Sequence, residues 1–120
     1  MSSEQHFVNA IYDELFKDNF NRYQASLNSP PDNGTDPFAR ARNALASLDD
    51  AQRSDVINFL KVVISDSACV ILGTLDGVHF PGYLDGEFLL SCDGEEIQGD
   101  LMDTFIGKAQ DDGVYEYFSM

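Results

Sequence analysis

The sequence predicts an α+β domain, in which three N-terminal helices pack with a small antiparallel hairpin and a short C-terminal helix. Two observations lead to this fold class. Only one of the nine glycines, Gly34, precedes residue 73, and glycine is a poor helix former. Apolar side chains in this first part recur at helical spacing, whereas turn dipeptides follow residue 76. We therefore expect one domain over 1–120, helical over about 4–73 and turn-rich over about 76–118.

Residues 4–27 are expected to form the first helix. Its apolar side chains recur at intervals of four residues and make one broad stripe, which consists of Phe7, Ile11, Leu15, Val8, Tyr12 and Phe16. Such spacing is typical of a helix that buries one face. Ser2 or Ser3 can cap its start, and the segment 28–35, which contains two prolines and a glycine, ends it.

Two further helices follow this loop. Asp36 is a suitable N-cap, and Pro37 suits the first helical position. Asp49 or Asp50 then caps a third helix, which we expect to end near Gly73. The apolar stretch over 68–75 also allows a late strand there.

Turn signals dominate the remainder of the chain, at Asp76-Gly77, Pro81-Gly82, Asp85-Gly86 and Asp93-Gly94. The last of these is a strong hairpin signal, and it joins an expected strand over 87–92 to a returning strand over 95–98. Gly99 and Asp100 open a short helix that ends at Gly107 or Gly113. The tail 114–118 alternates apolar and polar residues, so it is expected to add an edge strand or to dock onto the core.

Acidic residues outnumber basic ones by three to one. The chain has 21 Asp and Glu, 7 Lys and Arg, and a formal net charge of −14. Residues 61–120 contribute twelve acids but only Lys61 and Lys108, a net charge of −10. Such a surface repels nucleic-acid phosphates and anionic membranes and attracts basic partners.

No pattern in the sequence indicates catalysis or a cofactor. Neither histidine, His6 nor His79, has a cysteine nearby at zinc-ligand spacing. The acids do not fit the spacing of a calcium-binding loop, and neither phosphate-binding glycine motif occurs. We therefore expect a protein that is not an enzyme, with no cofactor and no dedicated metal site.

The two cysteines and the N-terminus indicate the compartment. Cys69 and Cys92 lie in apolar segments, so we expect both to be reduced and largely buried. The start of the chain has no secretory signal pattern, and the longest apolar run, over 68–72, is too short to cross a membrane. A cytoplasmic location is the expected default.

The acidic, aromatic C-terminal region is the most suggestive functional feature. Its candidate partner-binding residues are Asp85, Glu87, Asp93, Glu95, Glu96, Asp100 and Asp103. Aromatic anchors surrounded by charge are one way in which a protein recognises a basic partner. The alternative is that the aromatic residues form the core and the acids only keep the domain soluble.

The end of the chain resembles a group of small uncharacterised bacterial proteins. The resemblance rests on Asp100-Leu-Met-Asp-Thr-Phe-Ile-Gly-Lys108 and on Gly113-Val-Tyr-Glu-Tyr-Phe-Ser119, where the group has a Gly-aromatic…Phe-Ser ending. It covers about a third of the chain and implies an α+β bacterial domain, with no catalytic residues. The size and acidity are also similar, in composition only, to immunity proteins that block basic nuclease toxins and to nucleic-acid mimics of phages.

These observations predict a small non-enzymatic protein that binds, and in doing so neutralises, a basic protein partner such as a toxin or nuclease. The acidic field would steer the partner, and carboxylates with a few aromatic residues would occlude its cationic site. One alternative is an adaptor or self-associating domain whose charge keeps it soluble. Another is an inhibitor that mimics a nucleic acid.

Overall fold

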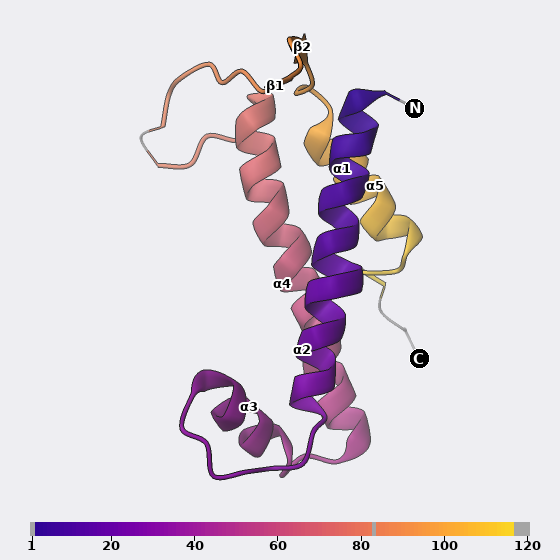
Figure 1. The fold of residues 1–120 in the computed structure, drawn as a ribbon, viewed down its shortest axis with the longest axis vertical. Coiled ribbons are helices and arrows are strands. Elements are labelled where there is room, and N and C mark those ends of the chain that lie inside the picture. The colour runs from indigo at the N-terminus through magenta and orange to yellow at the C-terminus, as the bar shows by residue number, and fades with distance from the viewer. Residues whose placement is uncertain (1, 83, 117–120) are drawn as a thin grey trace.

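A long pair of antiparallel helices forms the body of the protein (Figure 1). The structure is a computed structural model that describes residues 2–82 and 84–116. One arm is a continuous helix made of α1 (Ser3–Asp13), a π-helical segment η1 (Glu14–Asn19) and α2 (Phe20–Leu27). The other arm is α4 (Asp50–Asp76). The fold class is α+β, as the sequence predicts.

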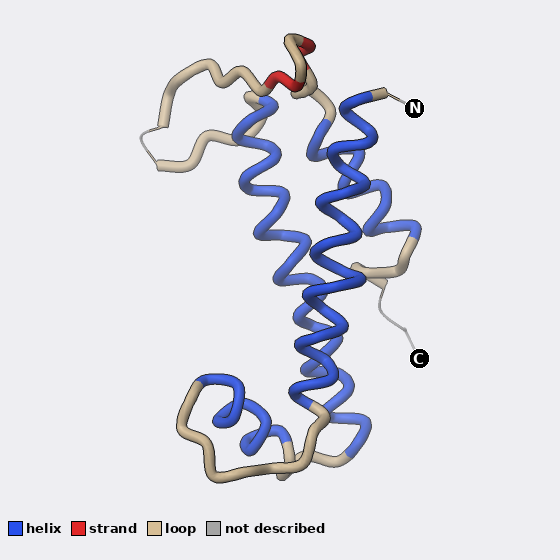
Figure 2. Tube along the Cα trace, viewed as in Figure 1, coloured by secondary structure: helices blue, strands red, loops and turns tan. Residues whose placement is uncertain are grey.

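Two shorter helices lie at opposite ends of this pair. α3 (Pro37–Leu45) packs near the end of α2, whereas α5 (Leu101–Asp111) packs against α1 and α4 (Figure 2). The helix over 4–27, the loop after it and the start of the next helix are confirmed. The possible strand over 68–75 is wrong, because α4 continues as a helix to Asp76.

The helix ends follow from local side-chain chemistry. The Ser2 hydroxyl accepts a hydrogen bond from the Gln5 backbone N–H, and the Asp36 carboxylate accepts from the N–H groups of Phe38 and Ala39. Asp49 caps α4 in the same manner. These caps satisfy N–H groups that have no partner within the helix. α4 ends at Gly77, whose positive φ of 78° is readily adopted only by glycine.

The hairpin is shorter than the sequence predicts. β1 (Ser91–Cys92) pairs antiparallel with β2 (Glu95–Glu96), where strands over 87–92 and 95–98 were expected. The turn at 93–94 is confirmed, since both of its residues have positive φ.

The side chain of Gln98 explains why the pairing stops early. Its amide oxygen accepts from the Leu90 backbone N–H at 2.9 Å, and its amide nitrogen donates to the Phe88 carbonyl at 2.9 Å. A side chain thus satisfies the backbone groups that a longer β2 would have paired. A two-stranded hairpin with no further strand is only marginally stable, so little favours its extension.

The C-terminal helix continues through Gly107, which the sequence marked as one of two possible ends. Instead α5 ends at Asp111, and Gly113 follows with a φ of 75°. Val114 is buried, which agrees with a tail that docks onto the core. None of residues 114–116 is in a strand, and the rest of the expected tail, 117–118, lies outside the described residues.

The core lies where α5 crosses α1 and α4. Its buried residues are Val8, Tyr12, Ala68, Leu72, Leu101, Phe105, Ala109 and Val114. The Tyr12 and Phe105 rings meet edge to face at 5.1 Å, a favourable aromatic geometry. The Tyr12 hydroxyl donates to the Asp112 carboxylate at 2.7 Å, and burial together with this acidic neighbour raises the Tyr12 pKa.

One carboxylate holds α5 against the end of α4. Asp76, the last residue of α4, accepts hydrogen bonds from the backbone N–H groups of Gly99 (2.6 Å), Leu101 (3.2 Å) and Met102 (2.8 Å). These N–H groups open α5, and they have no acceptor within that helix. No capping bond comes from Asp100, the residue at the N-cap position of α5. Asp76, a residue of α4, therefore caps the N-terminus of α5.

We predict that Asp76→Ala lowers the free energy of unfolding by about 2 kcal/mol, because it leaves three N–H groups without their charged acceptor. Urea denaturation followed by circular dichroism measures the change. Asp55→Asn, which alters an exposed carboxylate on the same helix, is the control and should change stability by less than about 0.5 kcal/mol. Equal effects of the two substitutions would contradict this role of Asp76.

Candidate functional site

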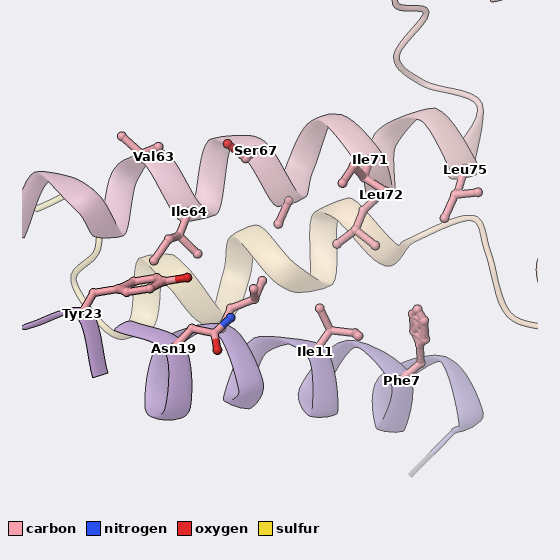
Figure 3. Close-up of a pocket in the computed structure, with 12 residues that line it drawn as sticks. Phe7, Ile11, Asn19, Tyr23, Val63, Ile64, Ser67, Ile71, Leu72 and Leu75 are labelled. Atoms are coloured by element: carbon pink, nitrogen blue, oxygen red, sulfur yellow. The ribbon is translucent and has the colours of Figure 1, made fainter. Parts of the chain in front are cut away.

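An apolar groove runs between the two long helices (Figure 3). One wall carries Phe7, Ile11, Leu15, Asn19 and Tyr23, a row with a spacing of four residues. The other wall is α4, which contributes Val63, Ile64, Ser67, Ala68, Ile71, Leu72 and Leu75. The groove has a volume of about 480 Å³, which is in the range of ligand-binding clefts.

The single apolar stripe that the sequence suggests for the first helix is two rows in the structure. Val8 and Tyr12 are buried under α5, whereas Phe7, Ile11 and Leu15 line the groove on the other side. Ile11 is 38 % exposed although it lies in the middle of the stripe. One apolar row of the first helix thus packs in the core, and the other row lines the open groove.

The outward face of α4 continues this apolar surface. Its exposed side chains are Val56 (46 %), Phe59 (61 %), Val63 (45 %), Val70 (44 %) and Ile71 (63 %). Between residues 56 and 75 the only charged residues are Lys61 and Asp66. We call this face the α4 stripe.

The helix α4 is therefore unusual for a helix of a protein core. By length and composition it could cross a membrane, and its most apolar window has a mean hydropathy of 1.8. Only 28 % of that window is buried within the structure. A core helix of this hydropathy is normally buried for most of its length, so this chain leaves an extensive apolar face uncovered.

The dimensions of the molecule agree with an open face. The radius of gyration is 17.4 Å, whereas a compact domain of this length has about 14 Å. α5 covers one side of the helical pair, and in the described part of the chain no element covers the groove on the other side.

Smaller apolar hollows extend the groove at both ends. Tyr23 also lines a hollow of about 260 Å³ together with Phe38 and Leu60. Phe7 lines another beside the hairpin, with Leu90 and Ile97. Because these hollows share a residue with the groove, the apolar surface follows the helical pair from the hairpin to α3.

Two like-charged side chains lie along the first-helix edge of the groove. Glu14 and Asp18 each precede a residue of the groove wall and are exposed. Phe16, which follows the wall residue Leu15, turns instead toward the core, where its ring lies 6.1 Å from that of Phe105. The two neighbours of a helical residue point to roughly opposite sides of the helix, so Glu14 points away from the core, on the solvent side of the groove wall.

The electrostatics of this edge remain acidic. A hydrogen bond with Asp18, and the charge of that carboxylate, raise the pKa of Glu14. The Lys17 ammonium forms an ion pair with Asp13 at 3.4 Å. Arg22 is the nearby cation that opposes the rise in the pKa of Glu14. The α4 edge carries no such carboxylate pair, so the groove has one acidic edge and one apolar edge.

All seven acids that the sequence suggests as a partner-binding set are exposed. They fall into three locations: Asp93, Glu95 and Glu96 are on the hairpin, Asp100 and Asp103 are at the start of α5, and Asp85 and Glu87 are on the loop 77–90. Figure 1 shows the hairpin beside the start of α5, whereas the loop projects to the side of the end of α4. The structure therefore gathers five of the seven around the hairpin and the start of α5.

Two polar contacts attach this acidic end to α1. The Ser3 hydroxyl donates to Glu95 at 3.2 Å, and the Asp100 backbone N–H donates to Glu4 at 3.0 Å. The hairpin thus lies at the end of the groove where Phe7 begins the apolar wall. The acidic end, which consists of the acids on the hairpin and at the start of α5, is therefore continuous with the groove.

A polar cluster on the opposite side of α4 holds the tail in place. The Tyr115 hydroxyl contacts Ser65 and lies 2.9 Å from an Asp66 carboxylate oxygen. Burial raises the pKa of Tyr115 and that of the Cys69 thiol nearby. A thiol with a raised pKa is a poor nucleophile, so this cluster is better suited to anchoring than to catalysis. Among the described residues no three His, Cys, Asp or Glu side chains could together hold a metal ion.

The expectation of two buried cysteines is wrong for one of them. Cys69 is partly buried on α4, but Cys92 is exposed on β1. The physical reason is the shortness of the hairpin: among the described residues its two strands pair only with each other, and Cys92 borders an open hollow beside the start of α1.

Comparisons with protein-family models, with curated proteins and with solved structures find no match to this chain. The groove was not anticipated from the sequence, although a signal for it exists. Apolar residues occupy more of α4 than one buried face requires, and the first helix carries two apolar rows where a surface helix needs one.

We predict that two neighbouring substitutions on α4 differ sharply in their effect on stability. Leu72→Ala removes a buried side chain (4 % exposed) and should cost about 2–5 kcal/mol. Ile71→Ala alters the groove edge and should cost less than about 0.5 kcal/mol. Urea unfolding of the two variants measures the difference. A large cost for Ile71→Ala would mean that this face is covered in the free protein.

We also predict that the two cysteines react at very different rates with a thiol reagent. The exposed Cys92 should react quickly in the native protein, whereas burial and a raised pKa should make Cys69 slow. Labelling of Cys69→Ser and Cys92→Ser separates the two rates, and denaturant should make them equal. Fast native labelling of Cys69 would show that the C-terminal half of α4 opens readily.

Proposed function

We propose that this chain is a cytoplasmic, non-enzymatic binding protein that captures and neutralises a basic protein partner, as inhibitors of the immunity type do. The observation that carries the proposal is the combination of an uncovered apolar face with an acidic end that adjoins it. Apolar surface supplies affinity, whereas charge supplies partner choice and association rate.

The acidic end would act before contact is made. Residues 61–120 carry a net charge of −10, and the seven candidate acids are all solvent-exposed. A field of this sign accelerates encounter with a cationic protein and orients it toward the acidic end. Apolar contacts would then form and slow dissociation.

Self-association is a second candidate function, and the α4 stripe favours it. An uncharged helix face of this length can pair with its own copy around a two-fold axis. The two functions respond to salt in opposite ways. Salt weakens binding to a basic partner, but it relieves repulsion between two chains of charge −14 and so strengthens a dimer.

The experiment begins with capture of partners from a lysate of the source cell and continues with the purified partner. For that complex we predict that the double substitution Glu95→Lys and Glu96→Lys mainly lowers the association rate, with stability unchanged or slightly improved. Surface plasmon resonance at several salt concentrations measures this rate. Asp55→Lys with Asp111→Lys is the matched control, because it changes the net charge equally at exposed sites away from the hairpin.

A partner whose association rate is the same for both double variants would remove the steering role of the acidic end. A partner of acidic or neutral character would overturn the proposed function as a whole. Sedimentation that detects a dimer at all salt concentrations, with no heterologous partner captured, would favour the self-associating alternative.

A further inference from the structure

The shape of the groove selects the kind of segment that can fill it. Two antiparallel helices form its walls, and apart from Asn19 its lining is apolar along four turns of the first helix. A third helix packs between two others by placing its side-chain ridges in their grooves, and helix-in-groove docking is a common mode of peptide recognition. A flat surface would leave the space between the walls empty.

The two edges of the groove differ in charge. Glu14 and Asp18 lie along the first-helix edge, and Arg22 is the one base that follows them at the same four-residue spacing. The opposite edge is the α4 stripe, which offers exposed Val63, Val70 and Ile71 and no charge-pairing group. An occupant must therefore be cationic on one side and apolar on the other.

We propose that the groove binds an amphipathic α-helix of the partner, with a broad apolar face and a row of Lys or Arg along one edge only. The apolar face covers the groove and the α4 stripe, and the basic row meets Glu14 and Asp18. This inference rests on the proposed function, since it states which part of a basic partner makes the main contact.

Charge argues against the two other occupants. A second copy has a charge of −14, and its first helix carries only two bases, Arg22 and Lys17, of which Lys17 is paired with Asp13. An anionic membrane is repelled by the same charge. Both remain outcomes of the experiment.

The probes are three synthetic peptides of about 18 residues, which as helices are about 27 Å long. The first has Leu at helical spacing and Lys along one edge. The second replaces each Lys with Glu, and the third has the composition of the first in an order without an apolar face. Fluorescence anisotropy with the full chain should give saturable binding of the first peptide, about tenfold or more weaker binding of the second, and none of the third.

Matched variants locate the site. Ile71→Asp introduces a charge into the groove and should weaken binding of the Lys peptide about tenfold or more. Leu89→Asp is its control, because Leu89 is exposed to a similar extent (66 % against 63 %) and lies outside the groove. Glu14→Gln with Asp18→Asn should weaken binding about threefold and reduce its salt dependence, whereas Asp55→Asn with Asp111→Asn should leave both unchanged.

Equal binding of the Lys and Glu peptides would overturn the charged-edge assignment. Sedimentation that shows a dimer abolished by Ile71→Asp would identify a second copy as the occupant, and flotation with anionic vesicles that depends on Ile71 would identify a membrane. Either result would overturn the proposal. If a natural basic partner binds the Ile71→Asp variant as tightly as the unaltered chain, this inference is overturned and the proposed function stands. If the natural partner is not basic, the proposed function is overturned.

Discussion

The contact that the rest of the structure depends on is the one between Asp76 and the first turn of α5. It joins the end of α4 to the start of α5 across the segment 77–100, in whose described residues the regular structure is limited to a hairpin with two residues in each strand. With α5 fixed there, Phe105 reaches Tyr12 and the core forms. The hairpin is held near α1 by separate contacts, from the Ser3 hydroxyl to Glu95 and from the Asp100 N–H to Glu4.

The two sides of the helical pair differ in their contribution to stability. The side under α5 holds the buried cluster that includes Tyr12, Leu72 and Phe105, so substitutions there cost the most stability. The other side contributes little to stability, since its apolar residues are already partly in water. The side chains on that side can therefore be replaced without unfolding the protein.

Much of the fold could be predicted because it depends on local chemistry. Caps such as Asp36 and Asp49, and the turn at Asp93-Gly94, are specified by residues close in sequence. The short hairpin, by contrast, depends on the Gln98 side chain, and the N-terminal support of α5 depends on Asp76. Such long-range polar contacts leave no periodic pattern in the sequence.

The candidate site was predictable only in part, for a related reason. Exposed acids could be expected from turn positions, but the groove exists because nothing described packs over one of two apolar rows. Periodicity predicts which face of a helix is apolar, but it does not predict which apolar residues another helix or strand will cover. Ile11 and Tyr12 are adjacent in the sequence, yet only Tyr12 lies beneath α5.

The π-helical segment sets the rotational phase of the groove wall. In a regular α-helix a four-residue step advances by about 40°, so a row from residue 7 to residue 23 would turn by about 160° and end on the far side. The wider turn over Glu14–Asn19 accommodates an additional residue, which reverses much of this drift. Loss of one residue from η1 would rotate α2 by about 100° and carry Tyr23 away from α4, so the length of this segment is itself a constraint on the shape of the groove.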